Sequence, residues 1–572
     1  MRESSVGGNP FLAALLIAGA LVLFAFVPSP RGLAEPDEAR HAEVAREMAA
    51  SGDWVVPTLY HVTYLEKPPL FYWILGGSIS LFGATENAVR WPVALIGLAT
   101  IAATAAYAGR AGGGRLAAHA ALVLAASGGF LFSCRLVLLD VLFAALIAGV
   151  LFLFHALATG RARKSRPLLG ALYFLLGLAV LTKGPTGAAI PLVAGAAYFT
   201  ITRSWRTLPS FRPLFGAAVL VAVTAPWFAL AESRSPGFLR FFLLDRHWAR
   251  FRGDIDVHHQ PWHFYFPVVL GAMLPWTFLA PAAAFGLRRE PATAPRRFDS
   301  PFAFCVLAAF VVVGVFTASA TKLPSYVLPA APALAVVAAI PLDRFAGGAG
   351  SARAYSAAAS VFAAVALAFA AVGFGPFLER APVGFAGIEP FARAGALALG
   401  AGLLLSAVFA ALPRFRALSI AAAAAGTALG LGIALRGADA FDPLRSLKPA
   451  AAALRREMRP GDRIVDFRRA KPSLLFYTDL RPTYVGDPGE LRVGLASGGA
   501  ADPGRYLPKE EIGRVFAGPE RVLCVVAFDK IDLLERQGIA PHVLWNEGEY
   551  AIVSNRPPSA GDRPPKGGAP GD

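Results

Sequence analysis

The segment EPDEARHAEVAREM (residues 35–48) follows shortly after FLAALLIAGALVLFAFV (residues 11–27), an apolar run without a charged residue. Within fourteen residues the segment carries five carboxylates, two arginines and one histidine. The apolar run approaches the roughly 20 residues that cross a bilayer, and it is longer than the apolar part of a typical signal peptide. We therefore interpret it as a retained membrane helix, and the charges beside it require an explanation.

The composition indicates a membrane protein. Of 572 residues, 56% are hydrophobic and 16% are charged, and the mean hydropathy is +0.53, whereas soluble proteins carry about 25% charged residues. The three cysteines, Cys134, Cys305 and Cys524, are far apart in sequence, which argues against a disulfide framework or a cysteine zinc site.

Apolar windows predict about thirteen transmembrane helices. They lie near residues 11–28, 87–108, 116–133, 137–158, 167–182, 185–201, 213–231, 262–284, 301–318, 323–341, 354–374, 391–412 and 417–435. The segment Leu70–Phe82 is apolar but too short to cross the bilayer, so we expect it to form an interfacial helix.

Basic residues are concentrated in the loops on one side of these spans. They run from Arg110 and Arg115, after the second predicted span, to Arg414 and Arg416, before the last. Basic loops remain cytoplasmic, so the N-terminus is predicted to be cytoplasmic. An odd number of spans then places the C-terminal end in the periplasm of a bacterial inner membrane. This pattern accounts for most of the formal charge of +16, and nucleic acid is not expected as a partner.

We expect three parts: a transmembrane catalytic domain over residues 1–436, a periplasmic α/β domain over 437–555 and a disordered, Pro/Gly-rich tail over 556–572. Two outer loops of the first part are long, residues 29–86 and 232–261. In the α/β domain an amphipathic helix is predicted over Ser446–Met458. Strands are predicted over residues 462–467, 474–478, 521–528 and 550–554.

Ionisable residues that orientation does not require gather on the outer face. In the first loop Asp37 and Arg40 precede Glu66 and Lys67, which lie beside an aromatic segment where ions are costly to desolvate. Asp140 opens a span at the same face, where an acidic residue indicates a function, although it could instead cap the helix or pair with a nearby arginine.

Other outer residues have simpler explanations. The spacing of charges after Arg40 suits surface ion pairs, so Glu43, Arg46 and Glu47 are interpreted as the polar face of a helix lying on the membrane. The second loop contains the adjacent pair His258 and His259, which suggests a metal ligand but lacks regularly spaced partners.

Acids, cations and aromatic residues at one membrane face suit the handling of a lipid-linked phosphate. Lysine and arginine would neutralise the phosphate. A carboxylate would act as a base or stabilise a cationic sugar transition state, and apolar spans would hold the lipid tail.

Four motifs resemble the aminoarabinose transferases that modify lipid A, which belong with protein O-mannosyltransferases to the GT-C glycosyltransferases. These motifs follow in the family's order: residues 35–73, RLVLLD (135–140), HHQPWHFYFPVVLGAMLPW (258–276) and TKLPSYVLP (321–329). The resemblance covers about residues 11–440. It implies a polytopic α-helical GT-C fold and transfer of a sugar, 4-amino-4-deoxy-L-arabinose in the family, from an undecaprenyl phosphate donor to lipid A or a related envelope acceptor.

The resemblance also implies roles for single residues. Asp37 and Asp140 match the family's acidic catalytic positions. Arg40 and Lys67 match positions that hold the donor phosphate, and Tyr326 lies in the motif that lines the same pocket.

Further roles are less direct. Glu66 and the pair His258–His259 resemble a place where a divalent metal ion binds, and no other cofactor is expected. Arg246, Arg250 and Lys322 are added to the phosphate-binding group from their charge and position.

Alternatives remain open at this point. A protein O-mannosyltransferase-like or O-antigen-modifying enzyme would share the fold and use another acceptor. A lipid flippase or transporter would carry ionisable residues near mid-span and broken helices, whereas the charges here lie at one face. Asp37 would be a general base for a hydroxyl acceptor, but for an already ionised lipid A phosphate it would mainly stabilise the transition state.

Overall fold

The computed structural model describes residues 31–248, 259–279, 299–373 and 387–558. Within these ranges nine helices are long and apolar enough to cross a membrane, or ten if the bent pair α5 (Gly114–Ala125) and α6 (Gly128–Cys134) forms one span. The nine are α4 (Glu86–Gly112), α7 (Leu139–Ala158), α8 (Arg166–Lys183), α10 (Pro213–Arg234), α15 (Pro301–Ala318), η6 with α16 (Pro324–Ala346), α17 (Ala352–Val372), α19 (Glu389–Ala410) and η8 with the start of α20 (Pro413–Gly437).

Three predicted spans differ from this set. The first, residues 11–28, lies outside the described residues. The span at 185–201 is α9 (Pro185–Ile201), an apolar helix that is slightly shorter than the others. The described part of 262–284 is broken into η3 (Trp262–Phe264), α13 (Tyr265–Ala272) and η4 (Trp276–Leu279).

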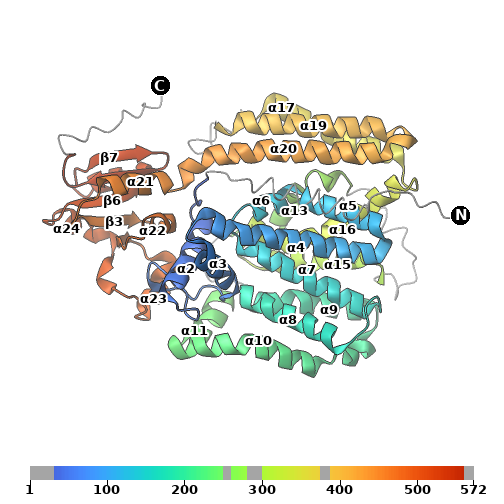
Figure 1. The fold of residues 1–572 in the computed structure, drawn as a ribbon, viewed down its shortest axis with the longest axis horizontal. Helices are drawn as coiled ribbons and strands as arrows, with labels where there is room; N and C mark the ends of the chain where they lie inside the picture. Colours follow the sequence, from blue (N-terminus) through green and yellow to red (C-terminus); the bar gives the residue numbers. More distant parts are fainter. Residues whose placement is uncertain (1–30, 249–258, 280–298, 374–386, 559–572) are drawn as a thin grey trace.

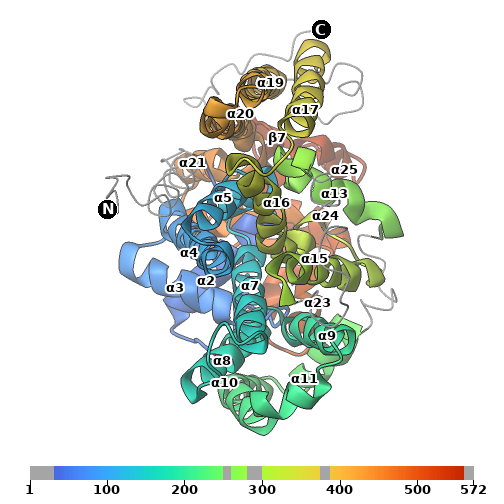
Figure 2. The same cartoon turned by 90° about the vertical axis from the view of Figure 1, so that its right-hand side faces the viewer.

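The membrane helices run side by side in three groups, seen lengthwise in Figure 1 and end-on in Figure 2. Helices α4, α5, α7, α15 and α16 lie in the centre, with α8, α9 and α10 on one side and α17, α19 and α20 (Arg416–Arg445) on the other. Small residues let α19 and α20 approach closely, because a Cβ added to Gly402 would lie 2.4 Å from the Cα of Gly426.

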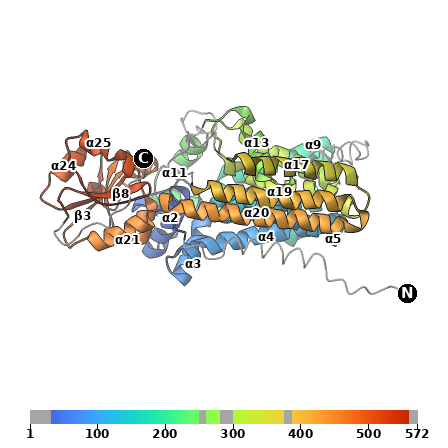
Figure 3. The same cartoon turned by 90° about the horizontal axis from the view of Figure 1, so that it is seen from above.

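The C-terminal domain lies beyond one end of the helical bundle (Figures 1 and 3). Its six strands have the order β5-β4-β3-β6-β8-β7. Strands β5, β4, β3 and β6 are parallel to one another, whereas β8 pairs antiparallel with both β6 and β7. The strands are β3 (Arg463–Arg468), β4 (Thr483–Gly486), β5 (Tyr506–Leu507), β6 (Val522–Ala527), β7 (His542–Glu547) and β8 (Tyr550–Ser554). The domain's helices are α21 (Lys448–Glu457), α22 (Pro472–Thr478), α23 (Arg492–Ala496), α24 (Ile512–Phe516) and α25 (Asp532–Glu535).

The predicted α/β composition of this domain is confirmed, but one of its predicted strands is wrong. Residues 474–478 belong to helix α22, which begins at Pro472. A proline at the first helical position has its backbone angle already set for a helix. The apolar side chains of this segment, including Leu474 and Leu475, are buried, so burial rather than strand formation explains their hydrophobicity.

The first outer loop folds into α2 (Asp37–Ser51), the short antiparallel strands β1 (Thr58–Leu59) and β2 (Val62–Thr63), and α3 (Leu70–Phe82). The predicted helix over residues 70–82 is therefore confirmed. These elements lie between the bundle and the C-terminal domain (Figures 1 and 3). One hydrophobic core joins both parts, because Val44 and Tyr60 of the loop pack in the same cluster as Leu454 and Tyr484 of the domain.

The second outer loop contains α11 (Phe238–Arg240) and the π-helical segment η2 (Phe241–Trp248). It packs on the first outer loop through a small aromatic cluster that includes Leu65, Trp227 and Phe242. The three cysteines are buried, and none forms a disulfide.

Candidate active site

The start of α2 is anchored to the membrane bundle by a buried carboxylate. Glu38 Oε1 accepts hydrogen bonds from Arg31 Nη2 at 2.9 Å and Arg90 Nε at 3.0 Å. Its Oε2 accepts from the backbone N–H of Ala34 and from Arg90 Nη2. Burial opposes ionisation, but the two guanidinium groups outweigh it and hold the pKa of Glu38 below its usual value.

Asp37, one residue earlier, has different surroundings. Its side chain is 53% exposed, and it forms an ion pair with Arg40 one helical turn later. Arg40 also donates from Nη1 to Glu490 Oε2 of the C-terminal domain at 2.7 Å. Burial opposes the charge of Arg40, but the neighbouring side chains of Tyr64, Glu490 and Asp37 raise its pKa, so the guanidinium is charged at every relevant pH.

An apolar cavity of about 600 Å³ reaches Asp37 from within the bundle. Its walls come from α6, α13, η6 (Pro324–Ala330) and α16, and apart from Asp37, Ser133 and Ser325 its lining consists of aliphatic, aromatic, glycine and proline residues. Cavities of this volume and composition are typical of ligand sites that hold an apolar group and orient it by a few polar contacts.

A second charged pair lies next to this cavity. Asp140, in the first turn of α7, forms an ion pair with Lys183, the last residue of α8. Ser325 lies within hydrogen-bonding reach of the Asp140 carboxylate and also lines the cavity. The Lys183 ammonium lies 4.1 Å from the centre of the Tyr326 ring, a distance at which the ring face attracts the cation.

The charge of Lys67 acts on both Asp140 and His41, so its ammonium lies near these two side chains. His41 is buried against the rings of Phe71 and Tyr72. Burial and the cations Arg40 and Lys67 lower the pKa of His41 to about 3, so its imidazole is neutral near pH 7. Cations and carboxylates are therefore concentrated beside an apolar cavity that Asp37 and Ser325 help to line.

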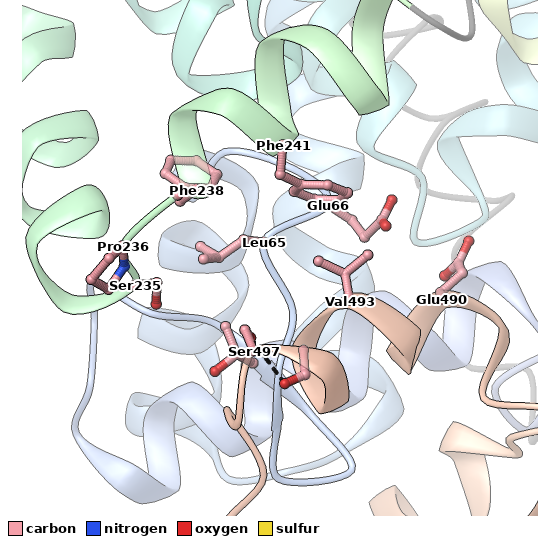
Figure 4. A pocket seen from close by; sticks show the side chains of 12 residues that line it. Leu65, Glu66, Ser235, Pro236, Phe238, Phe241, Glu490, Val493 and Ser497 are labelled. Atoms are coloured by element: carbon pink, nitrogen blue, oxygen red, sulfur yellow. Dashed lines mark hydrogen bonds between the residues drawn. The ribbon is translucent and has the colours of Figure 1, made fainter. Parts of the chain in front are cut away.

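The outer side of this cluster carries two further carboxylates. Glu66 forms an ion pair with Arg246 of η2, and Glu490 accepts hydrogen bonds from Arg40 and, at 3.0 Å, from the hydroxyl of Tyr64. Both carboxylates belong to the lining of a pocket of about 90 Å³ between the two outer loops and the C-terminal domain. Figure 4 shows them on the same side of that pocket.

Several known proteins are similar to this chain. The undecaprenyl phosphate-α-4-amino-4-deoxy-L-arabinose arabinosyl transferase of Pseudomonas aeruginosa is 34% identical over 331 residues, 56% of this chain and 58% of that protein. The protein of the same name from Edwardsiella ictaluri is 32% identical over 340 residues, 58% of this chain and 59% of that protein. The chain thus matches less than two thirds of the length of these curated relatives.

A family model described as dolichyl-phosphate-mannose-protein mannosyltransferase matches residues 66–229. The crystal structure of ArnT from Cupriavidus metallidurans bound to undecaprenyl phosphate aligns with 97% of this chain and 98% of its own, with a TM-score of 0.82 and 25% identity. The chain is similar to aminoarabinose transferases in sequence over more than half of its length and in fold over nearly all of it. It therefore has the GT-C fold and is a multi-pass inner-membrane protein.

The structure brings together most of the residues that the aminoarabinose transferase motifs single out. Asp37 and Arg40 form one ion pair at the cavity. Asp140 forms the second with Lys183, and Lys67 and Tyr326 lie near that pair. Their chemical roles remain predictions.

Other predicted site residues are placed differently. The Lys322 ammonium donates to the backbone carbonyls of Ser319 at 2.7 Å and Gln260 at 3.1 Å, so it joins two segments of the chain. Arg246 contacts Glu66. Arg250 lies outside the described residues.

The metal ion also remains a prediction. Among the residues described, no three His, Cys, Asp or Glu side chains come together as a metal site. Glu66 is paired with a guanidinium, His259 forms a backbone bridge with Thr321, and His258 lies outside the described ranges.

One interpretation of the sequence is wrong. Glu43, Arg46 and Glu47 are buried, with relative exposures of 0%, 8% and 2%, and do not form a surface face. Arg46 donates to both carboxylate oxygens of Glu43 and to Asp479 of the C-terminal domain. Glu47 accepts hydrogen bonds from the Thr58 hydroxyl and from a backbone N–H of the β1–β2 turn.

Sequence reasoning missed Lys183, Arg90 and Glu490 as partners of the outer carboxylates. Lys183 directly follows the predicted span 167–182, so the sequence placed it at the outer face but did not indicate its partner. Glu490 lies 450 residues after Arg40, and the sequence carried no signal that joins them.

Proposed function

We propose that this protein is a glycosyltransferase that moves a sugar from an undecaprenyl phosphate donor to lipid A or a related envelope acceptor. The favoured sugar is 4-amino-4-deoxy-L-arabinose, which the names of the similar proteins carry. The observation that supports the proposal best is the position of Asp37, paired with Arg40 at the end of an apolar cavity.

The donor would bind with its two chemical parts separated. Part of the prenyl chain would occupy the cavity of about 600 Å³, and the remainder would lie in the surrounding lipid. The phosphate would lie at the cavity mouth, where Arg40 and Lys67 supply positive charge and hydrogen-bond donors.

The transfer would be a single displacement with inversion. The bond between the sugar's anomeric carbon and the phosphate oxygen breaks as the acceptor oxygen bonds that carbon, and undecaprenyl phosphate leaves. Arg40 and Lys67 would stabilise the charge that develops on the departing phosphate. Asp37 would take the proton of a hydroxyl acceptor, whereas beside an ionised lipid A phosphate it would stabilise the cationic character of the sugar.

The site would lie at the periplasmic face. The basic loops predict a cytoplasmic N-terminus, and the first outer loop and the C-terminal domain share one end of the bundle (Figure 3). We therefore place that end, with Asp37 and Asp140, in the periplasm.

A protein O-mannosyltransferase-like activity is the second candidate. The family model that matches residues 66–229 carries that description, and this range includes Lys67, Asp140 and Lys183. The two activities would use the same donor phosphate site and differ in sugar and acceptor.

Mass spectrometry of lipid A and of envelope glycoproteins, in cells with and without the gene, tests both candidates. We expect loss of an aminopentose from lipid A when the gene is deleted, and its return when the gene is restored. Unchanged lipid A together with lost protein mannose would overturn the first candidate in favour of the second.

A further inference from the structure

Glu490 belongs to the C-terminal domain but lies beside the proposed donor site. It occupies the short 3-10 turn Gly489–Leu491, just before α23. Its Oε2 accepts one hydrogen bond from Arg40 Nη1 at 2.7 Å and another from the Tyr64 hydroxyl at 3.0 Å. The domain therefore contributes a carboxylate to a cluster that otherwise comes from the first outer loop and the bundle.

The hydrogen-bond donors of Arg40 show what this carboxylate does. A guanidinium has five N–H donors in a fixed plane. Nη1 of Arg40 donates to Glu490 and Nη2 donates to Asp37, so two carboxylates fix its orientation. Its buried Nε has no hydrogen-bond partner among the residues that the structure describes, which leaves a donor for a ligand.

Glu490 is ionised near neutral pH. Burial opposes ionisation, but the guanidinium groups of Arg40 and Arg246 lower the pKa of Glu490 below its usual value. Glu66 and Glu490, each paired with an arginine, lie on the same side of the outer pocket (Figure 4).

We propose that Glu490 is a positioning residue for the donor phosphate, which it serves by holding the Arg40 guanidinium beside Asp37. The proposal rests on the proposed function, because it assumes that Arg40 meets that phosphate. It makes the C-terminal domain a part of the donor site.

The alternative role for Glu490 is simple attachment of the domain to α2. The Arg46–Asp479 ion pair provides the comparison, since it joins the same helix to the same domain with an N–O distance of 2.6 Å. Arg46 directs its remaining contacts to Glu43, and the Asp479 side chain is 80% exposed. An attachment role predicts that the two ion pairs are equivalent, whereas a positioning role predicts that only the Glu490 pair affects the donor.

Loss of the Glu490 charge would redirect Arg40. Asp37 would then be its only described carboxylate partner, and arginine–carboxylate pairs tend to become bidentate. Such a pair would engage the guanidinium edge that the phosphate needs, so affinity for the donor should fall while affinity for the acceptor is retained.

The test measures binding of undecaprenyl phosphate to the purified full-length chain in detergent, by native mass spectrometry, together with KM values for donor and acceptor. We expect Glu490→Gln to raise the Kd for undecaprenyl phosphate and the donor KM roughly tenfold, with the acceptor KM unchanged, which is the effect of losing about 1.4 kcal/mol. Asp479→Asn, the matched control, should change each value less than twofold.

A double-mutant cycle separates action through Arg40 from action on its own. In a chain that carries Arg40→Ala, adding Glu490→Gln should have no further effect on the Kd. Tyr64→Phe provides a second variant that keeps its ring in place and removes one hydrogen bond to Glu490, and it should raise the Kd about twofold to threefold.

Three outcomes would overturn the inference. Equal binding by the wild-type chain and both Glu490→Gln and Tyr64→Phe would remove the positioning role while the proposed function stands. An equal loss in Asp479→Asn would assign Glu490 to attachment. A wild-type chain that does not bind undecaprenyl phosphate would contradict the proposed function itself, and the inference with it.

Discussion

Asp37 and Glu38 are adjacent carboxylates at the start of α2, and they differ in almost every other respect. The side chain of Glu38 is 2% exposed and accepts hydrogen bonds from two arginines and a backbone N–H. The side chain of Asp37 is 53% exposed, has one described ion-pair partner and lines the apolar cavity. A helix turns by about 100° per residue, so neighbouring positions face the bundle and the cavity respectively.

One short segment therefore holds both a structural carboxylate, Glu38, and a candidate reactive carboxylate, Asp37. A carboxylate with all its oxygens occupied by buried donors is fixed in place and cannot accept a proton from a substrate. The partly exposed carboxylate of Asp37, beside one guanidinium, remains accessible. Glu38 keeps the start of α2 in place, so Asp37 is held in the lining of the cavity.

The largest effect is expected from Asp37→Asn. We predict a loss of transfer of at least about a hundredfold, in line with removal of a general base or charge stabiliser, with no change in thermal stability. Activity on lipid A and the melting temperature of the purified protein check this. Full activity in the variant would end the catalytic assignment.

Glu38→Gln should show the opposite pattern. It leaves two buried guanidinium groups without their anion, and breaking a buried ion pair costs about 3–5 kcal/mol. We expect a markedly lower melting temperature and yield, with activity per folded molecule retained. If the variant were as stable as the wild type but inactive, the distinction between the two carboxylates would fail.

Lys67→Ala should have a smaller effect that is confined to the donor. We expect the donor KM to rise about tenfold, because a charged hydrogen-bond donor to a phosphate contributes about 1.5–3 kcal/mol. Lys164→Ala is the matched control, since that lysine precedes α8 and donates to Ser210 at the opposite end of the helix from Lys183. Unchanged dependence on donor concentration would remove Lys67 from the phosphate site.

The smallest effect concerns Glu35, which precedes Asp37 and accepts two hydrogen bonds from Ser473 of the C-terminal domain. Burial raises the pKa of Glu35 from 4.5 to about 8. The unfolded chain therefore loses this proton at lower pH than the folded protein, and stability falls as the pH rises from about 4.5 to about 8.

Glu35→Gln should reduce that fall and leave stability at pH 5 nearly unchanged. Part of the fall should remain, because burial also raises the pKa of Glu43 to about 8. Melting temperatures measured from pH 5 to pH 8 test this. Identical pH profiles for variant and wild type would show that Glu35 is already ionised in the folded protein.

Local patterns in the sequence were sufficient for much of the fold. Helix α3 was predicted with its observed bounds because its apolar run is short and begins directly after two prolines. The alternation of apolar windows and basic loops located most of the long helices. Residues 474–478 were misassigned because a short apolar run can be buried equally well as a strand or as a helix.

The site was predicted less completely, for a different reason. Glu43 and Arg46 have the spacing of an ordinary surface pair, and only the distant Asp479 and the packing of the C-terminal domain make them interior groups. The same holds for Glu490 beside Arg40. Contacts between residues hundreds of positions apart leave no periodicity or motif in a single sequence.

The shared core of the first outer loop and the C-terminal domain has a consequence for biogenesis. Arg46 and its partner Asp479 are separated by 433 residues, and at about 5–20 residues per second their synthesis is separated by about 20–90 s. During that time the first outer loop carries carboxylates and arginines whose final partners do not yet exist. A chain released before its last strands would leave these side chains unpaired and exposed to proteases and chaperones, so incomplete copies would be recognised before the two parts of the molecule join.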